Sequence, residues 1–257
     1  MSEKIDKGQS GISSEKNSSF FRTHLQSYSQ NVQQLDTYLR IRTSIEEAIS
    51  GTESLLDVGN GGVFDYDTSL ARKIVALDLF LEELPQDYTR PANATLKNGS
   101  ALDIPEPSES FDAVLMVMLL HHLVGNTTRE SVQNVRRALV EAYRVLRPGG
   151  KLVVIESCVS KSFFAFERLV FPLAAPLIHA AMQHPATLQY PASFLQNLIT
   201  EETGQILEVT KIPLGRWVLQ FGVKVPSVLS PVMPYRFIVH KRARTSVETL
   251  AERKAVT

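Results

Sequence analysis

The stretch LLDVGNGGVFDYDTS, residues 55–69, decides the fold class of this chain. A short apolar run ends in an acid at Asp57, and a glycine-rich turn with Gly59, Gly61 and Gly62 follows. Glycine tolerates left-handed backbone and the close approach of a ligand, so such a turn after a buried strand is typical of nucleotide-binding α/β proteins. The open question is which nucleotide the turn would hold.

Apolar strands and crossover segments alternate around this turn. We expect a helix over residues 20–50, strands at 54–58, 73–80, within 96–105, at 110–123 and 151–157, a helix over 127–146, a helix over 191–204, and two final strands within 205–215 and 234–242. Thr127 or Thr128 would cap the start of the long helix. The sequence RPGG, residues 147–150, would end it, because proline bars its continuation and glycine supplies the turn. This alternation predicts an α/β fold with a parallel sheet and helices on both faces.

Composition divides the chain into one domain with polar ends. We expect a disordered tail at residues 1–19, a single domain at 20–240 and a charged tail at 241–257. The domain would hold a core at 54–157 and a cap or substrate segment at 159–190. Part of that segment is as long as a membrane span, but its charged residues and prolines favour a buried or substrate-facing cap over a transmembrane segment.

Charge and cysteine content limit the classes of partner. The 27 basic and 27 acidic residues cancel, which argues against nucleic acid as a partner. The single cysteine, Cys158, can form no internal disulfide and offers no pair for zinc, so we expect a buried thiol and no metal site. The polar N-terminus lacks the apolar core of a secretory signal, which favours a cytoplasmic protein. We expect a monomer or a homodimer.

Three acids distinguish between the possible nucleotides. Asp57, Asp78 and Asp103 fall at successive strand ends, and Asp57 and Asp78 are one turn–helix–strand unit apart. The dinucleotide fingerprint needs a third glycine where Phe64 stands, and Asp57 would repel a pyrophosphate. A cofactor with a cationic head group and no phosphate, such as S-adenosyl-L-methionine, makes that acid favourable. Asp78 would then accept the ribose hydroxyls, and Asp103 the adenine amino group.

Four segments in this order resemble the class I S-adenosylmethionine-dependent methyltransferases, in particular the subgroup with ubiquinone, menaquinone and natural-product methyltransferases. They are LLDVGNGG, VALDLF, SALDIPEPSESFDAVLMVMLLHHL and EAYRVLRPGGKLVVIE, between about residues 54 and 157. The resemblance implies a Rossmann-like, doubly wound, seven-stranded, mostly parallel sheet with an N-terminal helical extension and a helical cap after the fifth strand. It also implies S-adenosyl-L-homocysteine as the product of the cofactor.

The resemblance assigns the cofactor to residues at the strand ends. They are Asp57, Gly59, Gly61, Asp78 and Asp103. Their neighbours Asn60, Leu79 and Leu102 are also expected in the cofactor site, with the two leucines as walls for the adenine ring. The chain departs from the family pattern at residues 62–69, where GVFDYDTS replaces direct entry into a helix. We therefore expect a distorted or longer loop there, in which the contacts of Asn60 are open.

His121, His122 and Glu156 are the candidate catalytic residues. They end the fourth and fifth strands, where a methyl donor should meet its acceptor, and imidazole can remove a proton from a hydroxyl. A structural or cofactor-lining role for these side chains stays open. Asp112, in contrast, is expected to serve the start of its strand.

The expected function is transfer of a methyl group to a small, apolar or aromatic acceptor, such as a quinone-like compound or a secondary metabolite. The acceptor pocket would come from Tyr28, Tyr38 and the apolar segment at residues 163–190. That segment could instead pack the core or a dimer interface. Two other classes remain open, an RNA methyltransferase and a protein that binds S-adenosylmethionine without methyl transfer.

Overall fold

The computed structural model describes residues 36–81, 84, 88–165, 187–205, 207–220 and 223–243. The expectations for the tail at 1–19, for Tyr28, for the cap between 166 and 186 and for most of the C-terminal tail lie outside these residues. Within the described part of the chain, no helix is long and apolar enough to cross a bilayer.

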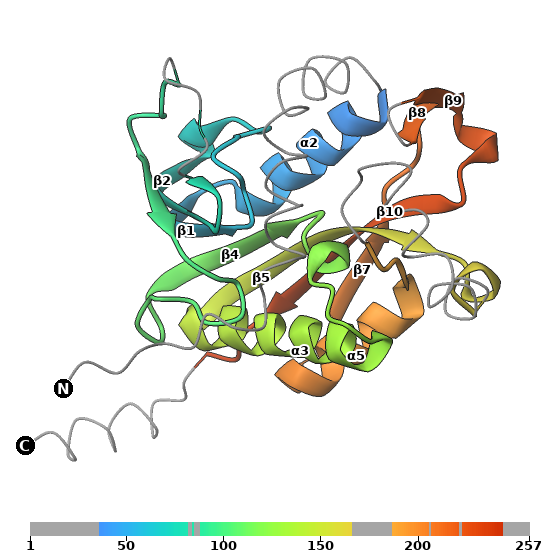
Figure 1. The fold of residues 1–257 in the computed structure, drawn as a ribbon. Helices are drawn as coiled ribbons and strands as arrows, with labels where there is room; N and C mark the ends of the chain where they lie inside the picture. The colour runs from blue at the N-terminus through green and yellow to red at the C-terminus, as the bar shows by residue number, and fades with distance from the viewer. Residues whose placement is uncertain are drawn as a thin grey trace, which may run out of the picture.

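A twisted, mostly parallel sheet forms the centre of the molecule (Figure 1). Its strand order is β3-β2-β1-β4-β5-β10-β7, and the short β6 pairs with β5. The strands are β1 Thr52–Val58, β2 Ala71–Asp78, β3 Ala94–Asn98, β4 Phe111–Val117, β5 Leu146–Val159, β6 Tyr190–Pro191, β7 Leu207–Lys211 and β10 Val232–His240. Only β10 runs antiparallel to its neighbours β5 and β7. The expected Rossmann-like sheet with seven principal strands is confirmed.

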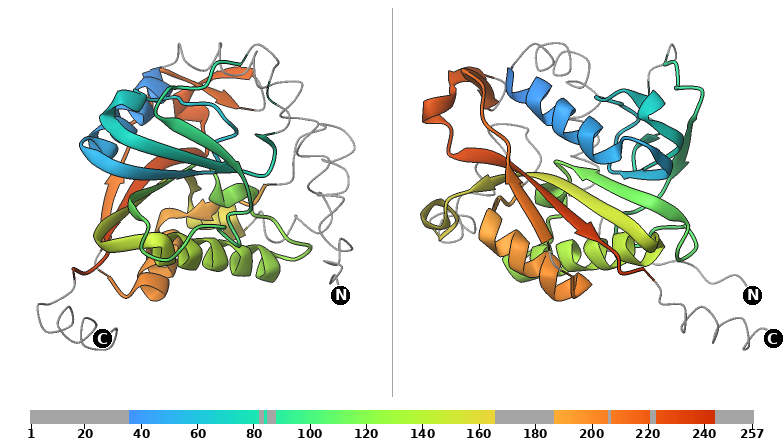
Figure 2. Two further views of the ribbon diagram at one scale, coloured as in Figure 1. Left: turned by 90° about the vertical axis from the view of Figure 1, so that its left-hand side faces the viewer. Right: turned by 180° about the vertical axis from the view of Figure 1, so that it is seen from behind.

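Helices cover both faces of this sheet (Figures 1 and 2). On one face lies α2, Asp36–Ile49, and on the other lie α3, Thr128–Val145, and α5, Ala192–Thr203. The apolar spacing explains the packing, because Ile41, Ile45 and Ile49 recur every four residues and are all buried. Each face has its own hydrophobic core cluster.

The crossover from β1 to β2 contains no α-helix. Residues 59–70 form a loop that ends in one 3-10 turn, η1, Thr68–Leu70. The expectation of a turn–helix–strand unit between Asp57 and Asp78 is therefore wrong, whereas the expected atypical loop is present. Phe64 and Tyr66 explain the difference, because their rings pack on the α2 face of the sheet, in contact with each other, where a helix would lie.

Two further details differ from the sequence-based expectation. RPGG, residues 147–150, lies inside the start of β5 rather than between helix and strand, and α3 ends at Val145. An unexpected antiparallel hairpin, β8 Trp217–Gln220 and β9 Val223–Pro226, stands between β7 and β10. It is followed by the 3-10 turn η4, Ser227–Leu229. The start of the long helix is as predicted, since Thr127 caps α3 by accepting the Glu130 N–H.

Candidate functional site

The carboxyl ends of β1, β2 and β4 meet at one edge of the sheet. β1 lies between β2 and β4 and is parallel to both, so the residues that follow these three strands are neighbours in space. This edge is where open α/β sheets bind their ligands. It therefore holds the glycine turn after β1, the acid that ends β2 and the residues after β4.

The glycine turn is held onto the end of β2. Gly59, Gly61 and Gly62 all have positive φ, at 75°, 63° and 80°, so each occupies backbone that other residues adopt only with strain. The N–H of Gly61 donates to the Asp78 carboxylate at 2.9 Å, and the N–H of Gly59 donates to the carbonyl of Leu77 at 2.8 Å. The backbone amides and the second acid of the site are thus brought into direct contact.

Asp57 is a buried carboxyl, only 3% exposed, at the end of β1. Tyr66 donates its hydroxyl to Asp57 Oδ2 at 2.7 Å, and Asn60 donates Nδ2 to the same oxygen at 2.8 Å. Burial raises the pKa of Asp57 to about 7, and the charges of Asp78 and Asp65 act in the same direction, against the two hydrogen bonds. A carboxyl that titrates near neutral pH at a ligand-binding edge is a candidate for binding a cation.

Asn60 closes the turn on itself. Its Nδ2 also donates to the Val63 carbonyl at 2.6 Å, and its Oδ1 accepts the Gly62 N–H at 2.8 Å. This side chain therefore shapes the loop and orients Asp57, which defines the contacts that the sequence left open.

A second loop, residues 99–110 between β3 and β4, carries Leu102 and Asp103. Asp103 is exposed, and its N–H donates to the carbonyl of Ser100 at 3.2 Å to close a tight turn. Leu102 is half-buried, and Leu79, which follows β2, is 50% exposed. An exposed leucine at this edge provides apolar surface that a flat aromatic ligand could cover.

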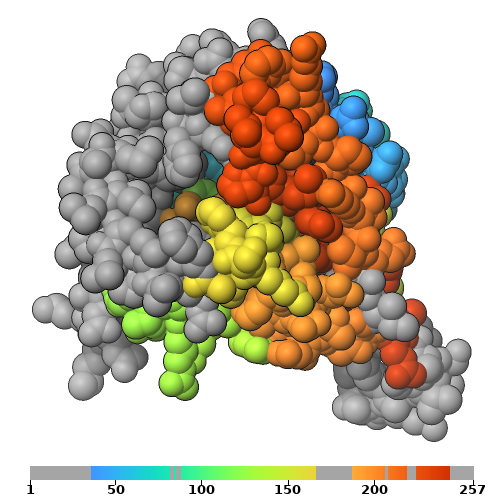
Figure 3. Space-filling model, turned by 90° about the vertical axis from the view of Figure 1, so that its right-hand side faces the viewer, coloured from blue at the N-terminus to red at the C-terminus, as the bar shows by residue number. Residues whose placement is uncertain are grey.

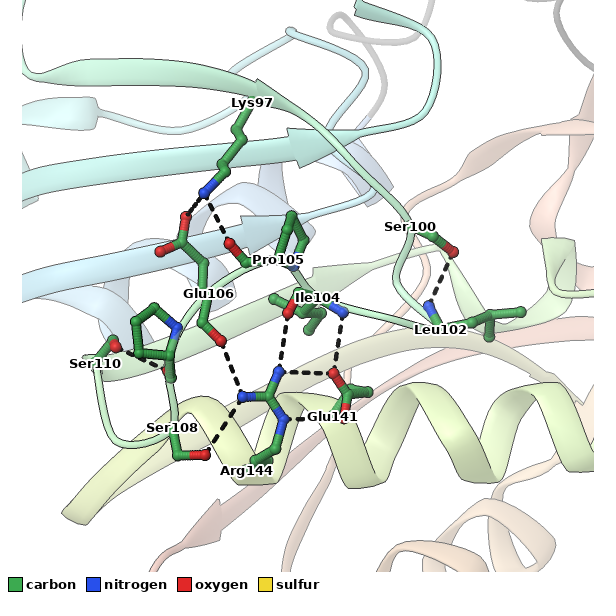
Figure 4. Close-up of polar contacts among 11 residues, drawn as sticks. Lys97, Ser100, Leu102, Ile104, Pro105, Glu106, Ser108, Ser110, Glu141 and Arg144 are labelled. Carbon is green, nitrogen blue, oxygen red and sulfur yellow. Dashed lines mark hydrogen bonds and ion pairs between the residues drawn. The ribbon is translucent and has the colours of Figure 1, made fainter. Parts of the chain in front are cut away.

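An arginine from α3 fixes this second loop from below (Figure 4). Arg144 donates to the carbonyls of Ile104 and Glu106, both at 2.9 Å, and pairs with Glu141 at 2.7 Å. Glu141 in turn accepts the Ile104 N–H at 3.0 Å. Because its donors fork in a plane, one guanidinium ties two carbonyls of the loop to the helix.

On the same loop, Lys97 donates to the Pro105 carbonyl and pairs with Glu106 at 2.7 Å, so the loop is also tied to β3 (Figure 4). The residues that directly follow Asp103 are therefore tied both to α3 and to β3, which fixes the loop that carries Leu102 and Asp103.

His121 and Glu156 form a buried pair. His121 lies in the 3-10 turn η3, Leu120–His122, that follows β4, and Glu156 lies inside β5 near its carboxyl end, so neither residue ends its strand as expected. Glu156 is fully buried, and its Oε1 lies 2.6 Å from His121 Nδ1. Its carboxyl also accepts the Leu120 N–H and the Ser157 N–H, both at 2.8 Å. A carboxylate that accepts from Nδ1 places the imidazole proton there and leaves Nε2 as the proton acceptor of the ring.

The turn after β4 brings further side chains to this pair. The ring of His122 lies beside that of His121, with 4.1 Å between centroids. Met118 has a φ of 51°, a left-handed conformation that a side-chain-bearing residue rarely adopts, and its N–H donates to the carbonyl of Ile155 at 2.8 Å. Backbone of this kind is often found where a chain is held at a functional edge.

Aromatic side chains gather beyond the end of β5. Tyr190 pairs with Cys158 in the β5–β6 ladder and stacks on Phe194 with 5.5 Å between ring centroids. Phe164 lies 6.1 Å from Tyr190 and 5.9 Å from Phe194. The described part of the expected cap therefore packs on the core with aromatic rings. Cys158 is buried as expected, and burial raises the pKa of its thiol.

The structure joins some of the predicted residues and places others nearby. Direct contacts link Asp57 with Asn60, Gly61 with Asp78 and His121 with Glu156. Asp112 serves the start of β4, where it accepts from Ser54 and Arg147. No group of three or more His, Cys, Asp or Glu among the described residues could hold a metal ion.

Sequence reasoning missed Tyr66, Glu141 and Arg144. Tyr66 lies in the stretch that departs from the family pattern, so no motif marked it. Glu141 and Arg144 are three residues apart on a helix, the spacing of neighbours on one helix face, and that signal was present in the sequence.

Comparisons with known proteins agree with this geometry. Residues 56–154 match a family described as a methyltransferase domain. A demethylmenaquinone methyltransferase of Tropheryma whipplei (strain Twist) is 39% identical over 155 residues, 55% of this chain and 58% of that protein. The chain spans about half the length of the curated relatives it matches.

Solved structures show the same fold at low identity. An S-adenosylmethionine-dependent methyltransferase of Thermotoga maritima aligns with a TM-score of 0.53 and 18% identity, over 87% of this chain and 99% of that one. Human N-acetylserotonin methyltransferase in complex with S-adenosylmethionine aligns with a TM-score of 0.55 and 15% identity, over 90% of this chain and 57% of that one.

Proposed function

We propose that the protein, whose residues 56–154 match a methyltransferase domain, is a class I S-adenosylmethionine-dependent methyltransferase that transfers a methyl group from that cofactor to a small apolar or aromatic acceptor. The observation that carries the proposal is the His121–Glu156 pair, which lies on the same sheet edge as the acids of the cofactor site. The His121–Glu156 pair is suited to remove a proton, and the acids of the cofactor site are suited to hold a cation and a nucleoside.

The residues at this edge fit S-adenosylmethionine. Asp57 would face the ammonium group, and its raised pKa reflects the burial of a carboxyl that forms no ion pair with any residue that the structure describes. Asp78, oriented by the N–H groups of Gly61 and Phe80, would accept the ribose hydroxyls. Leu79 and Leu102 would cover the adenine ring, and Asp103 would accept from its amino group. When bound, the cofactor supplies a methyl group that its sulfonium makes electrophilic.

His121 is the proposed general base. Glu156 holds the imidazole by its Nδ1–H, so Nε2 can take the proton that an acceptor hydroxyl or acidic carbon loses as it is methylated. Leu120 and Ser157 keep Glu156 in place through their backbone N–H groups. His122, beside the first ring, is proposed to line the site rather than to share the proton.

An apolar aromatic acceptor is supported by two observations. The half-buried rings of Phe164 and Phe194 lie next to the end of β5, packed on the buried ring of Tyr190, and partly exposed rings of this kind can contact a flat apolar ligand. The relatives named demethylmenaquinone methyltransferases point to a quinol-like compound, and we extend that acceptor class to this chain as part of the proposal.

A methyl-transfer assay tests the proposal. Purified protein is incubated with labelled S-adenosylmethionine and a panel of lipophilic quinols, phenols, polar amines and bulk tRNA. Label in a lipophilic product supports the proposed acceptor class, and label confined to polar amines or RNA contradicts it. Cofactor binding without any labelled product, in cell extract as well, would indicate a protein that binds S-adenosylmethionine without transfer.

The base is tested by His121→Gln, which keeps an N–H donor for Glu156 but lacks a basic nitrogen. We expect kcat to fall by about a hundredfold or more, the usual contribution of a positioned base. Binding of S-adenosylhomocysteine, measured by calorimetry, should stay unchanged. His240→Gln, at the exposed end of β10, is the matched control. A kcat within threefold of wild type would remove His121 from the mechanism.

A further inference from the structure

The hairpin between β7 and β10 exposes large apolar side chains. Val228 and Leu229, in η4, are 86% and 69% exposed, the highest values among the exposed large apolar side chains of the described residues. Trp217, at the start of β8, is 37% exposed. Together with Arg216 and Lys224 we call these residues the hairpin patch. Burying such side chains is favourable, so a patch of this kind normally marks a contact surface.

Specific contacts bring the hairpin patch together. Trp217 pairs with Pro226 across the hairpin, and the Lys224 ammonium lies 5.6 Å from the centre of the Trp217 ring. The N–H of Ser227 donates to the carbonyl of Arg216 at 3.1 Å, which folds η4 back to the start of β8. The apolar and cationic side chains are therefore contiguous on one structural unit.

The hairpin is anchored to the body of the protein. The hydroxyl of Thr37 in α2 donates to the Trp217 carbonyl at 3.3 Å and accepts the Gly215 N–H at 2.8 Å. Val218, next to Trp217, is only 5% exposed. The exposure of Val228 and Leu229 thus belongs to a packed element, and the orange-red atoms of this part of the chain form surface that faces the viewer in Figure 3.

The sequence segment that forms the hairpin carries charge of a single sign, although the exposed Asp36 of α2 lies beside Gly215 at its base. Residues 209–247 contain no Asp or Glu, although acids and bases balance over the whole chain. Arg216 and Lys224 are exposed, and the ammonium of Lys224 lies close to the apolar ring of Trp217. A cation beside an indole and exposed aliphatic side chains is the composition of protein segments that lie at the surface of an anionic membrane.

We propose that the hairpin patch docks on an anionic lipid bilayer. Val228 and Leu229 would enter the boundary between headgroups and acyl chains, Trp217 would lie at headgroup level, and Arg216 and Lys224 would contact the lipid phosphates. Three apolar side chains are too few for a stable protein dimer, which needs about 800 Å² from each partner. A bilayer has no such minimum, because apolar insertion and charge attraction add within a fluid surface.

Strand register gives the docking surface its place relative to the site. β10 begins at Val232, which pairs with Val159 at the carboxyl end of β5, and the hairpin leads into this point. The hairpin patch is thus on the sheet edge that carries the candidate site. Docking requires neither cofactor nor acceptor, so the vesicle experiments test it independently of the proposed methyl transfer.

Vesicle flotation and tryptophan fluorescence test the inference. Trp217 is the single tryptophan of the chain, so its emission reports on the hairpin patch alone. The full chain is mixed with vesicles of phosphatidylcholine alone or of equal parts phosphatidylcholine and phosphatidylglycerol. We expect flotation and a blue shift of the emission with the anionic vesicles, both reversed by high salt, because the charge attraction is screened.

Variants locate the contact. Val228→Ser and Leu229→Ser should each lower the partition onto anionic vesicles by about tenfold, since each removes an aliphatic side chain from the inserted surface. Lys224→Glu should also weaken it. Val140→Ser, which changes an exposed valine of α3, is the matched control and should bind as wild type does. Circular dichroism confirms that each variant is folded.

Other results would overturn the inference. They are equal partition of the hairpin variants and the Val140→Ser control, equal binding to neutral and anionic vesicles, or an unchanged Trp217 emission. A change of oligomeric state in the Val228→Ser Leu229→Ser double variant, without vesicle binding by wild type, would identify the hairpin patch as a protein interface instead.

Discussion

Asp57→Asn should make the protein more stable at alkaline pH while it weakens cofactor binding. Both hydrogen bonds to this side chain, from Tyr66 and Asn60, reach the same oxygen, Oδ2. An asparagine can present its Oδ1 there and accept both, with no change in side-chain shape. The substitution thus removes a buried negative charge and keeps its two donors satisfied.

The size of the effect follows from the pKa of Asp57, about 7 when folded against an ordinary value of 3.8. A carboxyl whose pKa is raised by folding stabilises the folded state fully below its unfolded pKa, and this contribution is lost as pH rises through the folded pKa. Each pH unit in that interval changes the free energy of unfolding by about 1.4 kcal/mol. The free energy of unfolding of the wild type should therefore fall by roughly 2.5 kcal/mol between about pH 5 and pH 8, whereas that of Asp57→Asn should not show this fall.

Urea unfolding at both pH values, followed by far-ultraviolet circular dichroism, measures this difference. Asp112→Asn is the control. Partial burial opposes ionisation of Asp112, but hydrogen bonds from Ser54 and Arg147 outweigh it and hold the pKa of Asp112 below its ordinary value. Removing that charge should therefore destabilise the protein at alkaline pH, opposite to Asp57→Asn.

Two outcomes would refute the reasoning on Asp57. A gap between wild type and Asp57→Asn that is the same at both pH values would show that folding does not raise the pKa of this carboxyl. Unchanged binding of S-adenosylhomocysteine by Asp57→Asn would show that the carboxylate does not hold the ammonium. A gain in stability together with a loss of binding is the expected pattern for a charge retained for function.

Three further predictions concern the same edge of the sheet. Wild type should bind S-adenosylhomocysteine about tenfold more tightly at about pH 8 than at pH 6, because the ionised fraction of a carboxyl with a pKa of about 7 rises by that factor; a flat profile in calorimetry would contradict the role of Asp57. Tyr66→Phe removes a hydrogen-bond donor from Asp57, so the free energy of unfolding should fall by about 1 kcal/mol at alkaline pH. The pH profile of S-adenosylhomocysteine binding should move to higher pH, and an unmoved profile would show that the Tyr66 hydroxyl does not act on Asp57. Arg144→Met removes the guanidinium donor from the carbonyl of Glu106 and one of the two donors from the carbonyl of Ile104, which still accepts the Glu106 N–H. The protein should lose about 1–2 kcal/mol of stability and bind S-adenosylhomocysteine more weakly, and unchanged affinity would show that the loop keeps its shape without Arg144.

The linear sequence was sufficient for the principal strands of the sheet and for the acids at the ends of β1 and β2, whereas the β8–β9 hairpin was not predicted and Asp103 lies in the loop after β3. Period and composition mark a buried strand locally, and a parallel sheet brings successive carboxyl ends to one edge whatever the crossovers contain. For that reason the positions of Asp57 and Asp78 were predictable even though the helix expected between them is absent. The cap of α3 at Thr127 and the buried state of Cys158 were predictable on the same local grounds.

Only the tertiary structure decided which side chains meet. His121 and Glu156 are 35 positions apart in sequence, so no local pattern signals their hydrogen bond, which depends on β4 and β5 being neighbours in register. Phe64 and Tyr66 replace a helix because they find apolar partners on α2, a contact that no pattern within residues 62–69 reveals. Local periodicity decides what an element is, whereas packing between distant elements decides what it touches, and the candidate site is built from contacts of the second kind.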